Sequence, residues 1–204
     1  MKITEPSVMI TDFLLAVFMG FWGIAILTSN PSSSQGFWSF SFLFSSLGAI
    51  LGAISHGLKE NFSMRGNQGI WKLTTFSIGI ASYMMFAGLI TYYTQGSLHD
   101  ILIILDIISL VIYLIWMSEH DEFIYVIMYY GPAMLIVLIA NIIDLLSSDN
   151  TYSLNFIIGV ILAVIAAVIQ ISKKGLHKHF NNNDIFHLIQ IVSGYFLYLG
   201  VINL

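Results

Sequence analysis

Long apolar stretches separated by short polar breaks dominate the pattern of this chain. A helix needs about 20 mostly apolar residues to cross the hydrocarbon core of a bilayer. Stretches of that kind fall at about 9–29, 37–58, 70–94, 99–117, 123–146, 152–172 and 184–203. The breaks between them read "NPSSSQG", "KENFSMRGNQG", "TQGSLHD", "SEHDE", "SSDNT" and "SKKGLHKHFNNN". None of these breaks is long enough to form a second domain, so we expect a single transmembrane domain over residues 1–204.

The composition strengthens the interpretation as a membrane protein. The chain is 57 % hydrophobic and 9 % charged, whereas a soluble domain carries roughly 25 % charged residues. So few charges cannot cover a surface that faces water, and we expect an all-α integral membrane protein with membrane lipids as its surroundings. The absence of cysteine excludes disulfides and thiolate chemistry. No basic patch with interleaved aromatic residues indicates binding to nucleic acid.

The basic residues predict how the spans are oriented. Seven spans place the N-terminus and the second, fourth and sixth connecting loops on one side of the membrane. All 7 basic residues fall on that side: Lys2, Lys59, Arg65, Lys72, Lys173, Lys174 and Lys178. Lys and Arg mark the cytoplasmic face, so we expect the N-terminus in the cytoplasm and the C-terminus outside. With six or eight spans, the basic residues would be divided between the two sides of the membrane. Their distribution therefore also favours seven spans.

Small and polar side chains follow one face of three predicted spans. The sets at helical spacing are Asp12, Ala16, Gly20 and Gly23 in the first span, Ser45, Gly48, Gly52 and His56 in the second, and Asn183, His187, Gln190, Gly194 and Tyr198 in the seventh. Gly48 and Gly52 form a GxxxG motif, which lets another helix approach closely. Ionisable groups in spans are costly and usually face the protein interior. We therefore predict that these faces meet inside the bundle, near its cytoplasmic end.

Each of these faces carries an ionisable group for which two interpretations stay open. His187 is either a packing histidine satisfied by hydrogen bonds or a residue that binds a ligand. Asp12 either anchors the first span or belongs to a site, and Asp184 either complements the dipole at a helix N-terminus or takes part in chemistry. For His56 the glycines on the same face favour a functional role.

With the stretches "EPSVMITD", "SHG" and "NNNDIFH" at these positions, the layout resembles the CREST superfamily of seven-helix membrane hydrolases. This group includes alkaline ceramidases and proteins of the adiponectin-receptor type. The resemblance implies a zinc ion held by one histidine at the end of the second span and by two histidines of an HxxxH motif in the seventh. It also implies a serine one turn before the first histidine and an aspartate at the start of the third span. Three imidazoles and a water make an open zinc site, whose water ionises near neutral pH.

Carried over position by position, only part of that motif is present. His56 matches the ligand of the second span, and His187 matches the second histidine of HxxxH. Asn183 stands where the first histidine of HxxxH would be. Gly52 occupies the position of the serine, with Ser55 adjacent to His56 instead, and "RGNQGIWK" at the third span contains no carboxylate. The resemblance thus implies a degenerate metal site of His56, His187 and Asn183.

A carboxylate could replace the missing histidine, because some zinc enzymes use two histidines and one carboxylate. Glu5, Asp12 and Asp184 are the candidates near the required depth. Asp184 points about 100° away from Asn183 on an ideal helix, so Asp12 is the better candidate. The catalytic candidates are then Ser55 and Asp12. The candidates for contacts to a ligand are Glu5, Gln190 and Tyr198.

Three functions stay open. The number of ligands favours a non-catalytic relative of the hydrolases that binds a lipid or a small amphiphile. The first alternative is an active metal-dependent hydrolase of a lipid amide or ester, which uses His56 and His187. The second alternative is a small transporter or channel that uses Asp106 and the histidines as a relay, although no pair of broken helices in two halves supports it. A retinal protein is excluded, because the seventh span has no lysine for a Schiff base.

The stretches "SHG" and "FNNNDIFHLIQ" also resemble a family of bacterial seven-helix membrane proteins related to the same group. This second resemblance implies that the chain is located in the bacterial inner membrane. The polar site is then expected on the cytoplasmic side.

Overall fold

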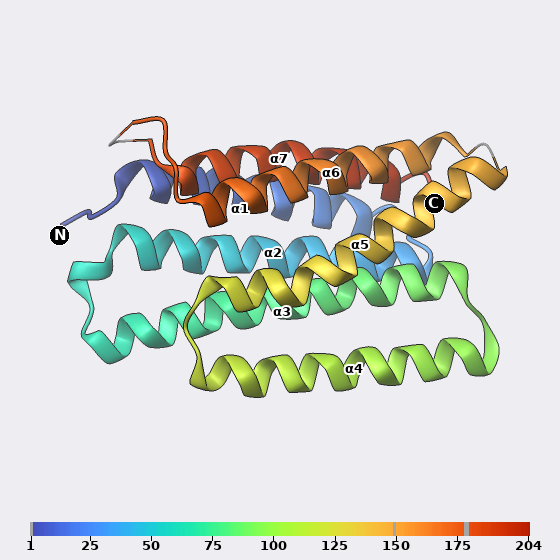
Figure 1. The fold of residues 1–204 in the computed structure, drawn as a ribbon, viewed down its shortest axis with the longest axis horizontal. Helices are drawn as coiled ribbons and strands as arrows, with labels where there is room; N and C mark the ends of the chain where they lie inside the picture. Colours follow the sequence, from blue (N-terminus) through green and yellow to red (C-terminus); the bar gives the residue numbers. More distant parts are fainter. Residues whose placement is uncertain (1, 149, 178–179) are drawn as a thin grey trace.

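The computed structural model describes residues 2–148, 150–177 and 180–204, and these residues form one helical bundle (Figure 1). Its helices are α1 (Pro6–Leu27), α2 (Ser33–Gly57), η1 (Lys59–Asn61, a short 3₁₀-helix), α3 (Met64–Tyr93), α4 (Gly96–Glu119), α5 (Phe123–Ser148), α6 (Thr151–Ser172) and α7 (Asn182–Val201). Within these residues, all 7 α-helices are long and apolar enough to cross a membrane. The expected all-α fold with seven candidate spans is confirmed, and it indicates a membrane-embedded protein.

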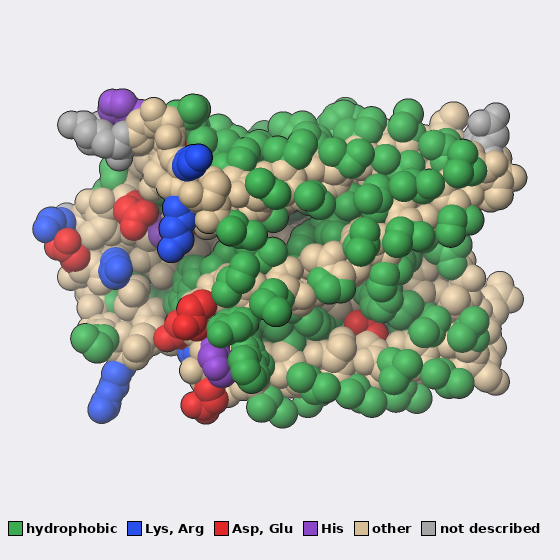
Figure 2. Space-filling view, viewed as in Figure 1, with side chains coloured by type: hydrophobic (Ala, Val, Ile, Leu, Met, Phe, Trp, Pro, Cys, Tyr) green, Lys and Arg blue, Asp and Glu red, His purple; other side chains and the backbone are tan. Residues whose placement is uncertain are grey.

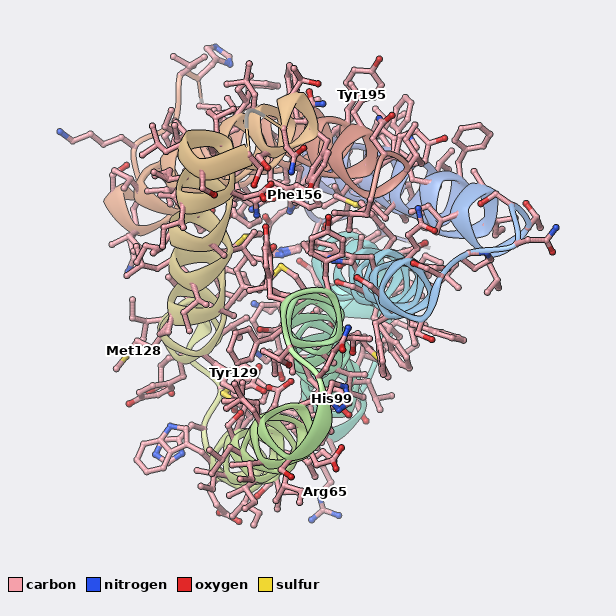
Figure 3. The ribbon with its side chains drawn as sticks, turned by 90° about the vertical axis from the view of Figure 1, so that its right-hand side faces the viewer. Arg65, His99, Met128, Tyr129, Phe156 and Tyr195 are labelled. Atoms are coloured by element: carbon pink, nitrogen blue, oxygen red, sulfur yellow. The ribbon has the colours of Figure 1, made fainter. Side chains whose placement is uncertain are left out.

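The order of the helices in space brings the first and the last helix together. α1 packs against both α2 and α7, and α3 packs against α2, α4 and α5. α6 lies beside α7 and meets α5, which crosses the bundle obliquely, while α4 lies at the edge with α3 as its main neighbour (Figure 1). Viewed from one end, Phe156 points into the bundle, whereas Met128 and Tyr195 point away from it (Figure 3).

Polar side chains fix where several helices begin. The Ser32 hydroxyl and the Gln35 side chain form a capping box at α2, and Asn181 and Asp184 form another at α7. At α3, the Ser63 hydroxyl accepts a hydrogen bond from the backbone N–H of Gly66 at 3.2 Å. The sequence-based expectation that this region is a loop up to about residue 70 is therefore wrong. With this cap and no proline in the segment, the polar residues "RGNQG" form the first turns of α3.

Serine hydroxyls hold neighbouring helices close together. The bonds that join different helices run from Ser39 to the carbonyl oxygen of Gly23 at 2.8 Å, from Ser46 to that of Ala16 at 2.7 Å, from Ser41 to that of Ala81 at 2.7 Å, from Ser34 to that of Gly88 at 2.8 Å, and from Ser193 to that of Gly159 at 2.7 Å. Small residues at these crossings allow the backbones to approach, as in other membrane bundles. Four of these bonds join α1 to α2 or α2 to α3, which fixes the helices that carry Asp12 and His56.

The surface of the bundle separates apolar sides from a charged end. Large apolar side chains such as Val17 and Ile115 are exposed. Hydrophobic side chains cover most of the length of the face shown in Figure 2. The Lys and Arg side chains visible in Figure 2 all lie toward the end that carries the N-terminus. Two lysines form ion pairs with acidic residues, Lys2 with Glu60 at 2.6 Å and Lys72 with Asp121 at 2.7 Å. Lys178 lies outside the described residues. That this end faces the cytoplasm stays a prediction of the charge rule.

Candidate functional site

A cavity of about 210 Å³ lies inside the bundle, toward its charged end. Residues of α1, α2, α3, α5, α6 and α7 line it. Its polar lining consists mainly of Asp12, Ser45, His56, Thr74, Gln170, Asn183, His187 and Gln190. The remaining lining is apolar or small and includes Met19, Ile78, Ile127, Met134 and Val164. The cavity is thus amphipathic, with polar groups from five helices and apolar walls.

The central polar contact joins Asp12 of α1 to His187 of α7. Nε2 of His187 lies 3.1 Å from Oδ1 of Asp12, and both side chains are less than a tenth exposed. The other ring nitrogen, Nδ1, lies 3.0 Å from the hydroxyl of Thr11. Both nitrogens of the imidazole are therefore engaged by neighbouring residues of α1. Such a fully partnered ring is well suited to hold Asp12 in a fixed position.

Asp184 provides a second connection between α7 and α1. Its carboxylate accepts the backbone N–H of Asn181 at 2.7 Å, as expected of an acidic residue in the first turn of a helix. It also accepts hydrogen bonds from Ser7 and Thr11 of α1, each at 3.3 Å. Asp184 is fully buried and is not among the residues that line the cavity. Its contacts agree with a role in capping α7 and docking it onto α1.

Glu5 and His56 form a second contact between a carboxylate and an imidazole. Oε2 of Glu5 lies 3.6 Å from Nδ1 of His56, and the His56 ring meets the indole of Trp71 edge-on. The contact with His56 holds the pKa of Glu5 below its ordinary value, and partial burial opposes this effect. Thr4 binds the last turn of α2 through its backbone N–H, which lies 3.0 Å from the carbonyl oxygen of Gly57. The segment before α1 therefore lies against the end of α2 that carries His56.

One oxygen of Asp12 has no partner. Asp12 is 4 % exposed, and its Oδ2 forms no hydrogen bond within the described part of the chain. The space beside this carboxylate exists because position 52 is a glycine. A Cβ added to Gly52 would lie 3.3 Å from Oδ2 and 3.4 Å from Oδ1 of Asp12. A buried acceptor without a partner is unusual and needs an explanation.

The structure brings together most of the residues that the sequence singles out. Asp12, His56, Asn183, His187 and Gln190 all line the cavity, so the small and polar faces of the first, second and seventh helices meet as predicted. Three further candidates, Ser55, Glu5 and Tyr198, are not part of the lining.

Each of these three side chains has contacts or burial elsewhere. Ser55 is buried but lies outside the lining, whereas the next residue, His56, belongs to it. Tyr198 stacks on Trp22 with the ring centroids 6.0 Å apart. Glu5 meets His56 from outside the lining.

The residues at the position of the zinc ligands do not fit that metal. Oδ1 of Asn183 accepts a hydrogen bond from Nε2 of Gln170 at 2.8 Å, so this oxygen is committed to α6. The two histidines each face a different carboxylate. Among the described residues, no group of three or more His, Cys, Asp or Glu side chains is arranged to hold a metal ion. Zinc stays a prediction of the resemblance.

Sequence reasoning missed several residues of the site. Gln170 is a single polar residue near the end of an apolar helix, and its position alone could have indicated an inward-facing side chain. Thr11 is adjacent to Asp12 in the sequence, but no sequence signal marks it as part of the site. Gly131 lines the cavity from α5, and a Cβ added there would meet nothing within 4 Å. No sequence signal identifies that open space, because it depends on how α5 crosses the bundle.

Asp106 lies apart from this site. It is buried in α4, which contributes no residue to the lining of the cavity. Its Oδ2 has no hydrogen-bond partner in the described ranges, and Ser109 donates to its backbone carbonyl at 2.8 Å. A relay through Asp106 stays a prediction of the sequence.

Comparisons with known proteins identify a family without assigning an activity. A family model described as "Family of unknown function (DUF6962)" matches residues 7–204. Comparisons with curated proteins and with solved structures find no match.

Proposed function

Because the chain belongs to the family of unknown function DUF6962, we propose from its site alone that the protein binds an amphiphile in the cavity. The polar head lies at Asp12 and His187, and the chain follows the apolar walls toward α5 and α6. One observation carries this proposal: the cavity joins a buried, incompletely hydrogen-bonded carboxylate to apolar walls that continue to the outer surface. Binding sites for small molecules commonly combine apolar walls with a few fixed polar groups.

The polar end supplies groups that suit a head group with hydrogen-bonding capacity. Oδ2 of Asp12 is an open acceptor. The Gln190 side chain also lines the cavity, and it makes no hydrogen bond within the described ranges. A bound polar head would give both groups hydrogen-bond partners. These bonds would offset the free-energy cost of burying the two groups without partners.

The apolar walls reach the side of the bundle that would face lipid. Val164 of α6 lines the cavity and is 51 % exposed, so the lining continues to the surface at this point. α5 and α6 meet at one end of the bundle and diverge toward the charged end (Figure 1). Figure 2 shows a hollow between them, bordered by hydrophobic side chains. This opening would let an amphiphile pass between the bilayer and the cavity without crossing water.

The size of the cavity limits how much of the amphiphile it encloses. Its volume of about 210 Å³ is below the roughly 300 Å³ at which pockets for drug-sized molecules begin. A head group and the first part of one chain fit inside, and the rest of the chain extends through the opening. We place the polar end at the cytoplasmic face of a bacterial inner membrane, on the basis of the basic residues and the resemblance.

Photolabelling in lipid nanodiscs tests this function without a competing detergent. A hexadecanol that carries a diazirine in its chain is incubated with the protein, irradiated, and mapped by peptide mass spectrometry. We expect labelled peptides from the α5 and α6 walls, including Ile127, Met134 and Val164, and displacement of the label by excess hexadecanol. Labelling spread evenly over the outer faces of all helices, with no displacement, would contradict a specific site.

The second candidate function is hydrolysis of an amphiphile in the same cavity, and the orientation of His56 favours it. Glu5 contacts Nδ1 of His56, and Nε2 has no hydrogen bond among the described residues. A carboxylate that orients one imidazole nitrogen while the other faces a substrate is the arrangement of a general base. Release of fatty acid from an N-acyl or ester amphiphile, lost in His56→Ala and retained in His99→Ala, would establish this activity.

A further inference from the structure

We infer that the head group of the bound amphiphile is a primary ammonium group. This inference rests on the proposed binding function and specifies the chemistry of its ligand. Three features of the cavity carry it: the sign of the charges around it, the unpartnered oxygen of Asp12, and the small space beside that oxygen.

The charges around the polar end are suited to a cation. Asp12 lines the cavity directly, and none of the described lining residues is a lysine or an arginine. The two imidazoles of the lining, His56 and His187, each already contact a carboxylate. A carboxylate or phosphate head would therefore come next to Asp12 without a free cation to compensate it, and like charges in a buried site repel strongly.

The open acceptor requires a ligand that donates hydrogen bonds. Oδ1 of Asp12 faces His187, whereas Oδ2 is buried and without a partner in the described part of the chain. An ammonium group has three N–H donors and a positive charge, so it can bond Oδ2 and still donate to the side-chain oxygen of Gln190. A hydroxyl head donates only one hydrogen bond and carries no positive charge that would stabilise an ionised Asp12.

The space at Gly52 selects a compact head. The α2 backbone lies so near that even a Cβ at Gly52 would come within 3.3 Å of Oδ2 of Asp12. A primary ammonium group is compact and brings its N–H donors into direct contact. A quaternary ammonium group has no N–H to donate, and its methyl groups would keep the charge away from the carboxylate. The geometry therefore favours a primary amine over a choline-like head.

Three photoreactive probes with the same diazirine-bearing hexadecyl chain test the inference in nanodiscs. Their heads are an amine, an alcohol and a carboxylate. We expect the amine to label the α5 and α6 cavity peptides at concentrations about ten-fold lower than the alcohol, and the carboxylate to label them least. In Asp12→Asn, the preference for the amine over the alcohol should fall to near equality. Asp100→Asn, which changes an exposed carboxylate of α4, should keep the wild-type preference.

The outcomes separate this inference from the function on which it rests. Labelling of the cavity by the alcohol in Asp12→Asn shows that the variant is folded, so that a lost amine preference reports on the head group alone. Equal labelling of the wild type by all three probes, or a preference for the carboxylate, would overturn the ammonium inference while leaving amphiphile binding intact. Absence of cavity labelling by every probe would overturn both.

Discussion

Nε2 of His187 lies 3.1 Å from Oδ1 of Asp12, so a buried polar pair joins the last helix of the bundle to the first. The two residues come from opposite ends of the sequence. The pair has two consequences. It holds α7 against α1, and it leaves the second oxygen of Asp12 free to meet a ligand in the cavity.

Removal of His187 should destabilise the bundle, because it leaves the carboxylate of Asp12 buried without its main partner. A buried hydrogen-bonding group that loses its partner costs about 1–3 kcal/mol, and more if it is charged. We expect His187→Ala to lower the midpoint of thermal unfolding strongly, measured in a mild detergent. His99→Ala, which changes a histidine of α4 outside the cavity, is the matched control and should have a much smaller effect. Equal midpoints for His187→Ala and wild type would show that the pair does not hold the helices together.

Enlargement of Gly52 should displace Asp12. The carboxylate oxygens lie at 3.3 and 3.4 Å from the position of an added Cβ, so an alanine is tight and a leucine requires the side chain to move. Overpacking of this kind costs about 1–3 kcal/mol. We expect a graded loss of thermal stability from Gly52→Ala to Gly52→Leu. Gly36→Leu is the control, because nothing lies within 4 Å of its added Cβ. If Gly52→Leu is as stable as Gly36→Leu, the inward orientation of this face of α2 is wrong.

A large side chain at Gly131 should block the cavity without harming the fold. An added Cβ meets nothing within 4 Å, although the residue lines the cavity. We expect Gly131→Trp to unfold at nearly the wild-type temperature and to lose about ten-fold or more of the displaceable labelling by the hexadecanol probe. Gly36→Trp should keep both properties. Undiminished labelling in Gly131→Trp would place the amphiphile somewhere else.

The contact between Glu5 and His56 predicts a dependence of stability on pH. The pKa of Glu5 in the folded protein is lower than its ordinary value of 4.5, mainly because of the contact with His56. The ionised form is therefore stabilised by folding, and this contribution is present above pH 4.5 and is lost as the pH falls through the folded pKa.

Glu5→Gln tests this dependence. We expect the variant to be less stable than wild type at neutral pH, with a difference that shrinks on acidification, in thermal unfolding measured at a series of pH values. Glu119→Gln, at the exposed end of α4, should follow the wild-type profile. A constant difference between Glu5→Gln and wild type across the acidic range would contradict the pKa assignment.

Zinc binding provides a test of the donor geometry. Asn183 is bonded to Gln170, and the described residues contain no group of three suitable ligands. We therefore expect added zinc to leave the unfolding temperature of the purified protein unchanged, since a ligand that binds the folded state would raise it. A rise that His56→Ala abolishes, together with stoichiometric zinc in metal analysis, would restore the metal site that the resemblance implies.

The sequence alone predicts the helices and the faces that they turn toward the interior of the bundle. Apolar length marked the spans, and helical spacing placed Asp12, His56 and His187 on interior faces because ionisable groups avoid lipid. The start of α3 was misplaced, because the cap at Ser63 outweighs the polar composition of the turn that follows. Hydropathy predicts well that a helix exists. Local capping signals predict less well where the helix begins and ends.

The contacts inside the site depend on tertiary packing that periodicity cannot reveal. Spacing could bring Asp12 and Asn183 to the same depth, but it could not show that Asp12 would pair with His187 while Asn183 bonds to Gln170. Those choices follow from α1 packing between α2 and α7, and from α6 packing beside α7. The open space at Gly131 has the same origin, since it arises from the oblique course of α5.

The position of the amphiphile within the cavity is the most direct test of the account. Two hexadecylamine probes are compared in nanodiscs, one with the diazirine beside the head and one with it at the end of the chain. If the head group is held at Asp12, the first probe labels the segments of α1 and α7 around Asp12 and His187. The second should label the outward-facing part of α5 and α6 near Val164, or lipid. The same labelled segments for both probes, or the reverse order, would contradict a head group held at Asp12.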